Sequence, residues 1–452
     1  MTKVQKTGVK WILLSAGIFT LWGGYLEATS YAGMGDFKAV YYGAKCLMEH
    51  HDPYKPADFE SVYESHGWKL PQDPVKARIV RLGLFVCVNL PTALLLAAPF
   101  ALLPWGPAHL LWMALMTAIM TFSAYLIWRQ AESHAPRVSL FLVCVLLANV
   151  EMLYALGNIA GIAVSLCVVA VWCFLEERYV GAGVACMAVA LAMKPHDVGL
   201  IWLYFVLAGG AYRKRALQVL LLTAALTLPA VLWVSHVAPQ WQTELHANLV
   251  AGAGHGQLND PGPTSFSFHY ADFVVSLQSL LSVFRDDPGF YNPASYLICG
   301  VMLLMGAWRT LRSRFSRTNA WFAIAAIAPL SVLPIYHRMH DAKLLILTIP
   351  ALALLWSEGG RSRWLALALN AAAVLSTADI FSTLLTMPFR HLSGEPTGVL
   401  EKLLTVAVVR PAPLCLLALS VFYLWVYWKR AAVVAPSTVQ PRLHAAPASE
   451  TC

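Results

Sequence analysis

The sequence contains little charge. Only 12% of its 452 residues are Asp, Glu, Lys or Arg, whereas an ordinary soluble domain carries about 25%. Hydrophobic residues make up 58%, and a soluble protein of this composition could not cover its own surface with polar groups. The composition therefore excludes a disordered protein, a secreted disulfide scaffold and a DNA-binding domain. It predicts that lipid surrounds much of the chain.

Paired cysteine motifs are also missing. The nine cysteines include no Cys-x-x-Cys pair and no Cys/His spacing typical of a zinc site. Most of them lie in apolar segments, where a thiol behaves as a small buried hydrophobe. We therefore expect no structural metal and no cofactor. The net charge of +8 does not indicate a nucleic-acid partner, because the basic residues lie between apolar runs and so report membrane topology.

Apolar runs of spanning length, by contrast, are abundant. Because only helices satisfy their own backbone groups in lipid, these runs predict an all-α polytopic membrane protein with about twelve spanning helices. The first run could instead be a signal peptide, but a spanning helix with a basic cytoplasmic flank is the better interpretation. The predicted spans are residues 11–28, 82–103, 108–128, 138–156, 158–175, 181–208, 216–235, 294–310, 320–336, 341–357, 364–386 and 408–428.

Basic residues predict the orientation. The segments expected in the cytoplasm are 213–215, 309–317, 361–363 and 429–430. With twelve spans, both termini then lie on the cytoplasmic side of a bacterial inner (plasma) membrane. Arg129, Arg137 and Arg178 conflict with this orientation, because they would face outward. A break of the span 181–208 at Lys194 would change the parity and would require 82–103 to be re-entrant.

The expected organisation is a single transmembrane domain over residues 1–430. Two polar loops, 29–81 and 236–293, are predicted on the outer side, each with a short surface helix, the second at about 272–284. In the second loop, the polar run from His255 to Pro263 could bind sugar hydroxyls or could be a solvated connector. Residues 431–452 are rich in Ala, Pro and Ser, which predicts a disordered cytoplasmic tail.

The first outer loop carries the clearest pattern. Apolar residues recur at helical spacing over 37–49, which predicts an amphipathic helix on the membrane surface. Asp36 directly precedes it, where its side chain could cap the helix N-terminus. A carboxylate held in this way would also be rigid and would lie at the level of a lipid head group. Capping and a functional role are compatible, so both interpretations stay open.

The motifs of this loop resemble a known family. The run Gly-Asp-Phe-x-x-x-Tyr-Tyr-x-Ala that starts at Gly35, followed by Asp52-Pro53-Tyr54, is similar to the first-loop signature of glycosyltransferase family 87, in the GT-C superfamily. The resemblance covers about residues 10–360. Further similar motifs follow in order: Asn89-Leu90-Pro91 through Pro104, Gly157-Asn158, Ala182-Gly183 through Lys194-Pro195, and His337-Arg338-Met339-His340-Asp341.

The resemblance implies a sugar transfer from a polyprenyl phosphate donor, such as a mannosyl phosphate. It implies an outer-face carboxylate that acts as general base on the acceptor hydroxyl, in a single displacement with inversion. Asp36 is the expected base. Asp52 is a second candidate, although Asp-Pro-Tyr is also an ordinary turn. The resemblance also makes Asn158 a candidate substrate-binding residue.

The leaving phosphate requires positive charge. Lys194, His337, Arg338 and His340 are the candidates, since an ionisable residue in an apolar helix indicates function by default. Lys194 could instead snorkel or pair with Asp197, and Arg338 could be an interfacial anchor. Two histidines with Asp341 form a thin ligand set, so we expect no metal here.

The resulting hypothesis is a membrane glycosyltransferase that moves a sugar, mannose being the first candidate, to a lipid or glycan acceptor at the outer face. A transporter or lipid flippase is the main alternative, and a non-catalytic envelope scaffold is a third. A transporter would be expected to show repeated halves and midplane charges. The chain shows no internal repeat and concentrates its polar residues in outer loops.

Overall fold

The computed structural model describes residues 2–263, 273–388 and 398–430. Over these residues the secondary structure is mainly helical, and an isolated antiparallel bridge joins Val274 and Arg338. Several helices have the length and apolar composition of membrane spans. The prediction of an all-α polytopic membrane protein is therefore confirmed. The predicted tail, residues 431–452, lies outside the described residues.

The helices fall into three groups. Six spans of the described chain are long and apolar enough to cross a membrane: α1 (Lys3–Thr29), α6 (Trp105–Ala131), the pair of α7 (Pro136–Ala148) and α8 (Glu151–Leu156), α12 (Gly210–Val237), α16 (Pro288–Arg312) and α22 (Pro411–Arg430). Four shorter helices are also apolar: α5 (Pro91–Ala101), α9 (Ala160–Glu176), α10 (Val180–Met193) and α11 (Pro195–Ala208). The other helical segments are α2 (Gly35–Met48), α3 (Pro56–Ser65), α4 (Pro74–Val80), η1 (Arg81–Phe85), α13 (Trp241–Ala253), α15 (Leu277–Leu281), α17 (Arg317–Ser331), η2 (Asp341–Thr348), α18 (Ile349–Glu358), α19 (Gly360–Ser376), α20 (Asp379–Thr386), α21 (Val399–Leu404) and η4 (Thr405–Val409). A count of twelve spans stays a prediction.

Several predicted spans are broken into separate helices. Residues 181–208 form α10 and α11, which meet at Lys194 with φ −148° and ψ 74°. Pro195 explains the break, because the residue before a proline is disfavoured in the α conformation while proline suits the first position of a new helix. Residues 138–156 divide in the same way at Asn149, between α7 and α8. Both breaks leave backbone N–H and C=O groups without a partner in their own helix, and these groups lie inside the bundle.

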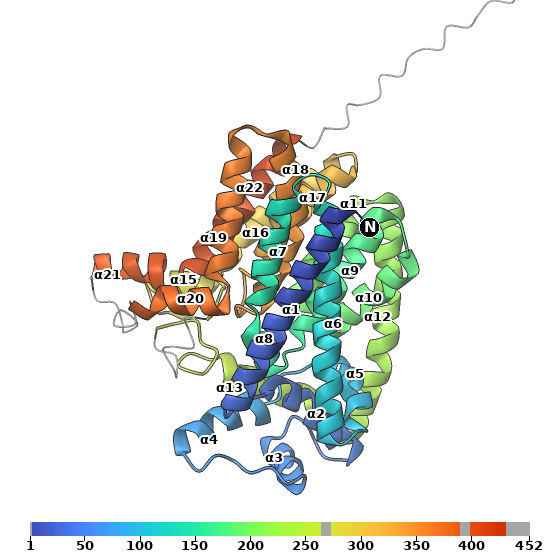
Figure 1. Cartoon of the computed structure of the whole chain (residues 1–452). Helices are drawn as coiled ribbons and strands as arrows, with labels where there is room; N and C mark the ends of the chain where they lie inside the picture. The colour runs from blue at the N-terminus through green and yellow to red at the C-terminus, as the bar shows by residue number, and fades with distance from the viewer. Residues whose placement is uncertain (1, 264–272, 389–397, 431–452) are drawn as a thin grey trace, which may run out of the picture.

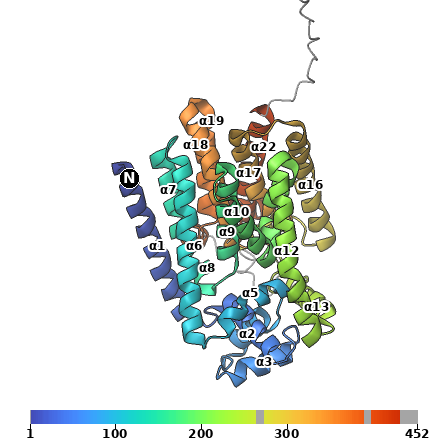
Figure 2. The same ribbon diagram turned by 90° about the vertical axis from the view of Figure 1, so that its right-hand side faces the viewer.

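The long helices run roughly along one common axis, and α2 and α3 pack across one end of the bundle (Figures 1 and 2). The N-terminus and the C-terminal end of α22 lie at the opposite end. A continuous hydrophobic core joins residues of α2, α5, α9, α17 and η2. The site described below lies where α2 meets this core.

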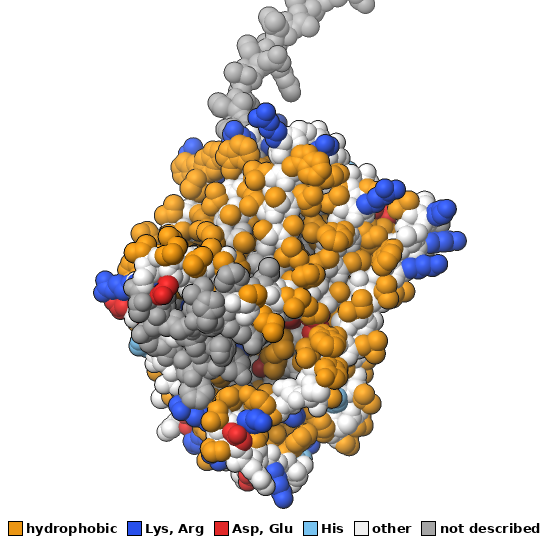
Figure 3. Space-filling model, turned by 60° about the vertical axis from the view of Figure 1, so that its left-hand side comes forward, with side chains coloured by type: hydrophobic (Ala, Val, Ile, Leu, Met, Phe, Trp, Pro, Cys, Tyr) orange, Lys and Arg blue, Asp and Glu red, His pale blue; other side chains and the backbone are white. Residues whose placement is uncertain are grey.

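The outer surface of the bundle is apolar. Leucines on three of the long helices are more than 70% exposed, namely Leu21, Leu221 and Leu304. Figure 3 shows hydrophobic side chains over most of the middle of one face, with lysines and arginines mainly toward its ends and edges. This distribution is that of a protein whose middle is surrounded by lipid.

The first outer-loop helix differs from its prediction in two respects. It spans Gly35–Met48 and is buried on several faces, since Ala39, Tyr42 and Cys46 are buried together with the predicted apolar stripe. The capping role of Asp36 is wrong. Met34, in the left-handed conformation with φ 56°, is the N-cap, and its backbone N–H donates to the Ala155 carbonyl oxygen at 2.7 Å. The helix therefore begins early enough to place Asp36 inside its first turn.

Candidate active site

Asp36 and Asn158 form one side of the site. Gly157 ends α8 with φ 64°, and a Cβ there would lie 2.8 Å from atoms of Met34 and Phe37, so only glycine lets this turn approach α2. Asn158 Oδ1 accepts from the backbone N–H of Ala160 at 2.8 Å. This bond turns the amide nitrogen outward, and Asn158 Nδ2 donates to Asp36 Oδ2 at 2.6 Å.

Lys194 lies at the break between α10 and α11. Its ammonium group pairs with Asp341 and, at 3.3 Å, with Asp197 in the first turn of α11. Asp197 and Asp341 are both buried. The pairing of Lys194 with Asp197, which the sequence left as an alternative, is therefore present, and Asp341 is added to it.

The turn at 336–341 supplies the remaining charged groups. His337 is fully buried, and its Nε2 lies 3.3 Å from Asp197 Oδ1. His340 Nε2 lies 3.6 Å from Asp341 Oδ1. The Asp341 carboxylate also accepts from the backbone N–H of Arg338 at 2.9 Å, which closes the turn. His337 and His340 are thus attached to the Lys194 group through Asp197 and Asp341, and Arg338 joins it through its backbone N–H.

The second outer loop reaches the same turn through Asn259. Its Oδ1 accepts from Arg338 Nη2 and from the Tyr336 hydroxyl, both at 2.8 Å. Backbone bonds of Val275 and Met339 join residues 273–275 to the turn. For this reason the predicted surface helix at 272–284 is wrong in extent: only Leu277–Leu281 are helical.

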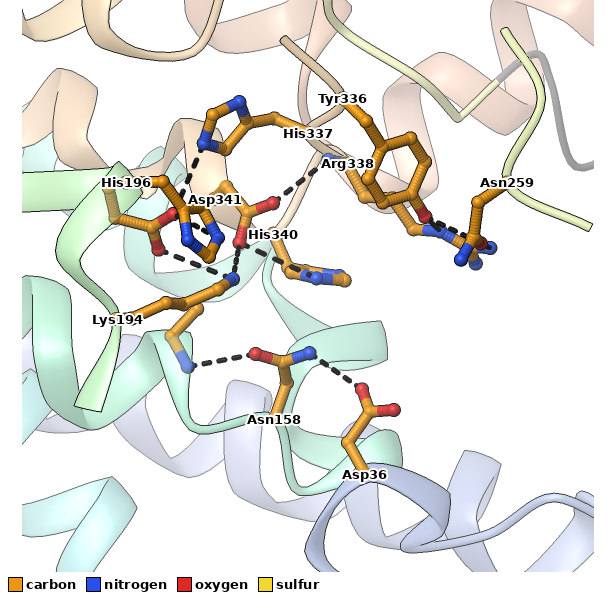
Figure 4. Close-up of polar contacts among 12 residues, drawn as sticks. Asp36, Asn158, Lys194, His196, Asn259, Tyr336, His337, Arg338, His340 and Asp341 are labelled. Atoms are coloured by element: carbon orange, nitrogen blue, oxygen red, sulfur yellow. Dashed lines mark hydrogen bonds and ion pairs between the residues drawn. The ribbon is translucent and has the colours of Figure 1, made fainter. Parts of the chain in front are cut away.

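Asp36 faces this group of charged residues. In Figure 4 the carboxylate of Asp36 and the amide of Asn158 lie below Lys194, His340 and Asp341, with Arg338 and Asn259 to one side. Burial lowers the pKa of His340, while the carboxylates of Asp341 and Asp36 act in the opposite direction. Asp36 of α2 and Lys194 at the α10–α11 break thus influence the turn at 336–341 electrostatically.

Asp52 has a different set of partners. Its Oδ1 accepts from the backbone N–H of Tyr54 at 2.9 Å, and its Oδ2 lies 3.7 Å from Lys55, which also pairs with Glu244 at 3.5 Å. These contacts are those of an Asx turn. The structure brings Asp36, Asn158, Lys194, His337, Arg338 and His340 together, and it gives Asp52 no described contact with them.

Three residues of the site were not singled out from the sequence. His196 follows Pro195, and its Nε2 lies 3.4 Å from Asp197 Oδ1. Asn259 was seen only as part of a polar loop, and Tyr336 only as the end of a predicted span. A signal existed for His196, because His196 and Asp197 are ionisable residues within an apolar run. Among the described residues, His196, Asp197 and His337 are also a set that could hold a metal ion.

The fold and the site together define a polytopic membrane protein with a buried charged site at one end of its bundle. The sequence matches the model of glycosyltransferase family 87 over residues 88–335. This is more than half of the chain, and the chain belongs to that family. It is therefore a membrane glycosyltransferase, and the transporter alternative is not supported. No curated protein and no solved structure matches the chain.

Proposed function

We propose that the chain transfers a mannosyl residue from a polyprenyl phosphate to a lipid or glycan acceptor at the outer face of the bacterial inner membrane. The observation that carries the proposal is the position of Asp36 opposite the histidine- and arginine-bearing turn at 336–341 (Figure 4). Membership of glycosyltransferase family 87 supports sugar transfer at a membrane. A site at the end of an apolar bundle suits a donor whose polyprenyl chain stays in lipid.

Asp36 is the proposed general base. Asn158 donates to one of its carboxylate oxygens, and we assign the other oxygen to the acceptor hydroxyl. As the new bond from the acceptor oxygen to the anomeric carbon forms, the hydroxyl proton passes to Asp36. The bond from the anomeric carbon to the phosphate oxygen breaks on the opposite face, which inverts the configuration.

The leaving phosphate is assigned to the other side of the site. Arg338 offers a planar guanidinium group suited to phosphate oxygens. His337 and His340 belong to the same turn, and Lys194 lies beside it. Phosphate is a competent leaving group, so these residues need only stabilise the charge that develops on it. We assign Asn158 to positioning of the base and Asp52 to the fold of the first loop.

The topology belongs to the same proposal. Residues 1–430 would form one transmembrane domain, with the loops 29–81 and 236–293 outside and both termini in the cytoplasm. The location of α2 and α3 at the end of the bundle opposite to the termini is consistent with this arrangement (Figure 1). Cysteines placed at the exposed positions 51 and 285, one in each outer loop, should then both react with an impermeant thiol reagent in spheroplasts.

The test compares Asp36→Asn with the unchanged protein. Asparagine keeps the shape and an oxygen that can accept from Asn158, so the fold should survive. The proton acceptor is lost, which typically costs 10²–10⁴-fold in rate. Purified protein would be incubated with radiolabelled polyprenyl phosphate mannose and total membrane lipid, and the label transferred to lipid would be counted.

Asp52→Asn is the matched control, since it changes a carboxylate of the same loop in the same way. It should keep transfer near normal. A folded Asp36→Asn protein with normal transfer would contradict the proposal, and a loss confined to Asp52→Asn would move the base to Asp52. No transfer from this donor by the unchanged protein would exclude the polyprenyl phosphate mannose.

A further inference from the structure

The site holds more negative than positive charge. Asp197 and Asp341 share the ammonium group of Lys194, and Arg338 is bonded to Tyr336 and Asn259. Three carboxylates, including that of Asp36, thus stand against one lysine and one arginine. A phosphate that gains charge as it leaves would be repelled by this balance unless further positive charge is bound.

Three ligand atoms converge beside Lys194. His196, Asp197 and His337 each offer one ligand atom, and these three atoms lie within 4.8 Å of one another. The carboxylate oxygen is 3.4 Å from the nitrogen of His196 and 3.3 Å from that of His337. Ligands placed tetrahedrally at the usual zinc–nitrogen distance of about 2.0–2.1 Å are separated by about 3.3–3.4 Å. Both nitrogen–oxygen distances are therefore those expected in a tetrahedral metal site.

The orientation of His337 supports the same conclusion. Its Nδ1 lies 3.1 Å from the carbonyl oxygen of Ile335, and a carbonyl can only accept, so Nδ1 carries the proton. In the neutral ring, Nε2 then presents a lone pair to Asp197 Oδ1, which is also an acceptor. A hydrogen bond from the far nitrogen to a carbonyl is the usual way in which a metal-bound histidine is oriented.

These buried atoms lack hydrogen bonds. Within the described part of the chain, His337 Nε2 and both carboxylate oxygens of Asp197 have no hydrogen-bond partner, and Lys194 meets Asp197 only as an ion pair at 3.3 Å. A proton on His337 would satisfy one of the two nitrogen–oxygen contacts. A metal ion would satisfy all three ligand atoms together.

We propose that His196, Asp197 and His337 bind a divalent transition-metal ion, for which Zn²⁺ is the best fit, and that its open position takes an oxygen of the donor phosphate. Two imidazoles and one carboxylate form the ligand set of many catalytic zinc sites, which leave the fourth position to substrate. When the anomeric carbon–oxygen bond breaks, the phosphate keeps the electron pair, and the ion stabilises the added charge. Metal binding itself does not depend on the proposed function; only the contact of the ion with the donor phosphate rests on it. From the sequence, we expected no metal at His337, His340 and Asp341. The proposed site uses a different set of ligands and replaces that expectation.

The test measures metal binding without donor or acceptor. Full-length protein in detergent would be stripped with a chelator, titrated with Zn²⁺ alone, and its bound metal counted by mass spectrometry after gel filtration. One ion per chain is expected. His337→Gln and His196→Gln should each weaken binding by at least about tenfold, the effect that loss of a mere outer-shell partner can have. His340→Gln is the matched control, because it changes a histidine of the same turn that contacts Asp341 instead.

The His196 side chain is 42% exposed, so His196→Gln should fold even if His337→Gln does not. Absence of stoichiometric Zn²⁺ binding, or equal binding by all three variants, overturns the site. If His337 and Asp197 instead form an imidazolium–carboxylate pair, no stoichiometric Zn²⁺ binding will be seen. Transfer that is lost on chelation and restored by Zn²⁺ supports the role at the phosphate. Transfer that chelation leaves unchanged overturns that role and leaves the proposed function intact. A protein that binds Zn²⁺ but transfers no sugar would support the site while contradicting the proposed function.

Discussion

Lys194 and Lys343 are both lysines in apolar surroundings, with side chains that are respectively 11% exposed and buried, but their ammonium groups bond to different kinds of partner. Lys194 pairs with the side chains of Asp197 and Asp341. Lys343, in η2, donates to two backbone carbonyl oxygens, those of Asn149 at 3.0 Å and Thr377 at 2.8 Å. Both carbonyls lie where a helix is interrupted, at the break between α7 and α8 and at the end of α19.

The difference indicates two roles for the same residue type. Backbone carbonyls are fixed acceptors that a broken helix leaves unsatisfied, so Lys343 joins three segments of the fold. The carboxylates of Asp379 and Glu151 act on its ammonium group through space. The partners of Lys194 are side chains that can rotate, titrate or accept a substrate instead. We infer a structural role for Lys343 and a chemical role for Lys194, and the predictions below test this division.

The largest effect is expected for Lys343→Met. Removing one partner from a buried charge group costs about 3–5 kcal/mol, because the remaining charges and carbonyls stay buried. The thermal midpoint in detergent should therefore fall, while transfer per folded molecule stays near normal. Lys214→Met is the control, since Lys214 is exposed. A midpoint equal to that of the unchanged protein would remove Lys343 from the structural role.

A second substitution sharpens this prediction. If unpaired negative charge is what destabilises Lys343→Met, adding Glu151→Gln should recover part of the lost midpoint. Glu151 is fully buried on α8, and residues that share one charge group give non-additive effects. Strict additivity of the two changes would show that Glu151 and Lys343 do not interact.

Lys194→Met should show the opposite pattern. Hydrogen bonds to charged groups contribute about 1.5–3 kcal/mol, so donor use should fall about ten- to a hundredfold. The loss of stability should be smaller than for Lys343→Met, because the Lys194 side chain is 11% exposed and Asp341 keeps the backbone N–H of Arg338. The measurements are kcat/KM for the donor and the thermal midpoint. Unchanged donor kinetics, or a thermal midpoint as low as that of Lys343→Met, would contradict the inference that Lys194 has a chemical role and Lys343 a structural one.

The local features of this comparison could be predicted from the sequence. Pro195 signals the break at Lys194, and the apolar spacing of the first loop gives α2 to within two residues of its N-terminus. The cap was wrong because the left-handed conformation of Met34 depends on its bond to Ala155 in α8. A contact between residues so distant in the chain leaves no local pattern.

Long-range polar pairs explain most of what the sequence could not show. Arg338 donates to the side chain of Asn259, and Lys343 donates to the backbone carbonyl of Asn149. Both bonds depend on how distant segments of the chain pack together. A lysine at the start of an apolar run is commonly a snorkelling residue, so the sequence gives no sign that Lys343 is buried. The burial that rules out snorkelling is visible only once η2 is placed beside α7 and α19.

A smaller effect is expected for Asn158→Ala. Loss of the 2.6 Å bond to Asp36 should cost about 1 kcal/mol, which is roughly a fivefold loss of rate. The thermal midpoint should fall slightly, because the bond from the backbone N–H of Ala160 is lost as well. Asn149→Ala is the matched control from the other region: it removes the side-chain bond to the Val145 carbonyl oxygen and keeps the backbone carbonyl that binds Lys343. A rate that falls equally in both variants would indicate a general effect of packing.

The smallest effect concerns the pH dependence of the site. Burial lowers the pKa of His340 below its usual value, which is about 6.5 in an unfolded chain. As the pH falls through about 6.5, the unfolded chain takes up a proton that folded His340 does not, so the unfolded state binds more protons. The stability that neutral His340 contributes is therefore complete above this pH and is lost progressively below it, toward the lowered pKa of the folded state. His340→Gln should reduce the fall of the thermal midpoint between about pH 6.5 and pH 5, whereas substitution of the exposed His51 should leave it unchanged. An equal slope in the unchanged protein and in His340→Gln would show that folding does not change the pKa of His340.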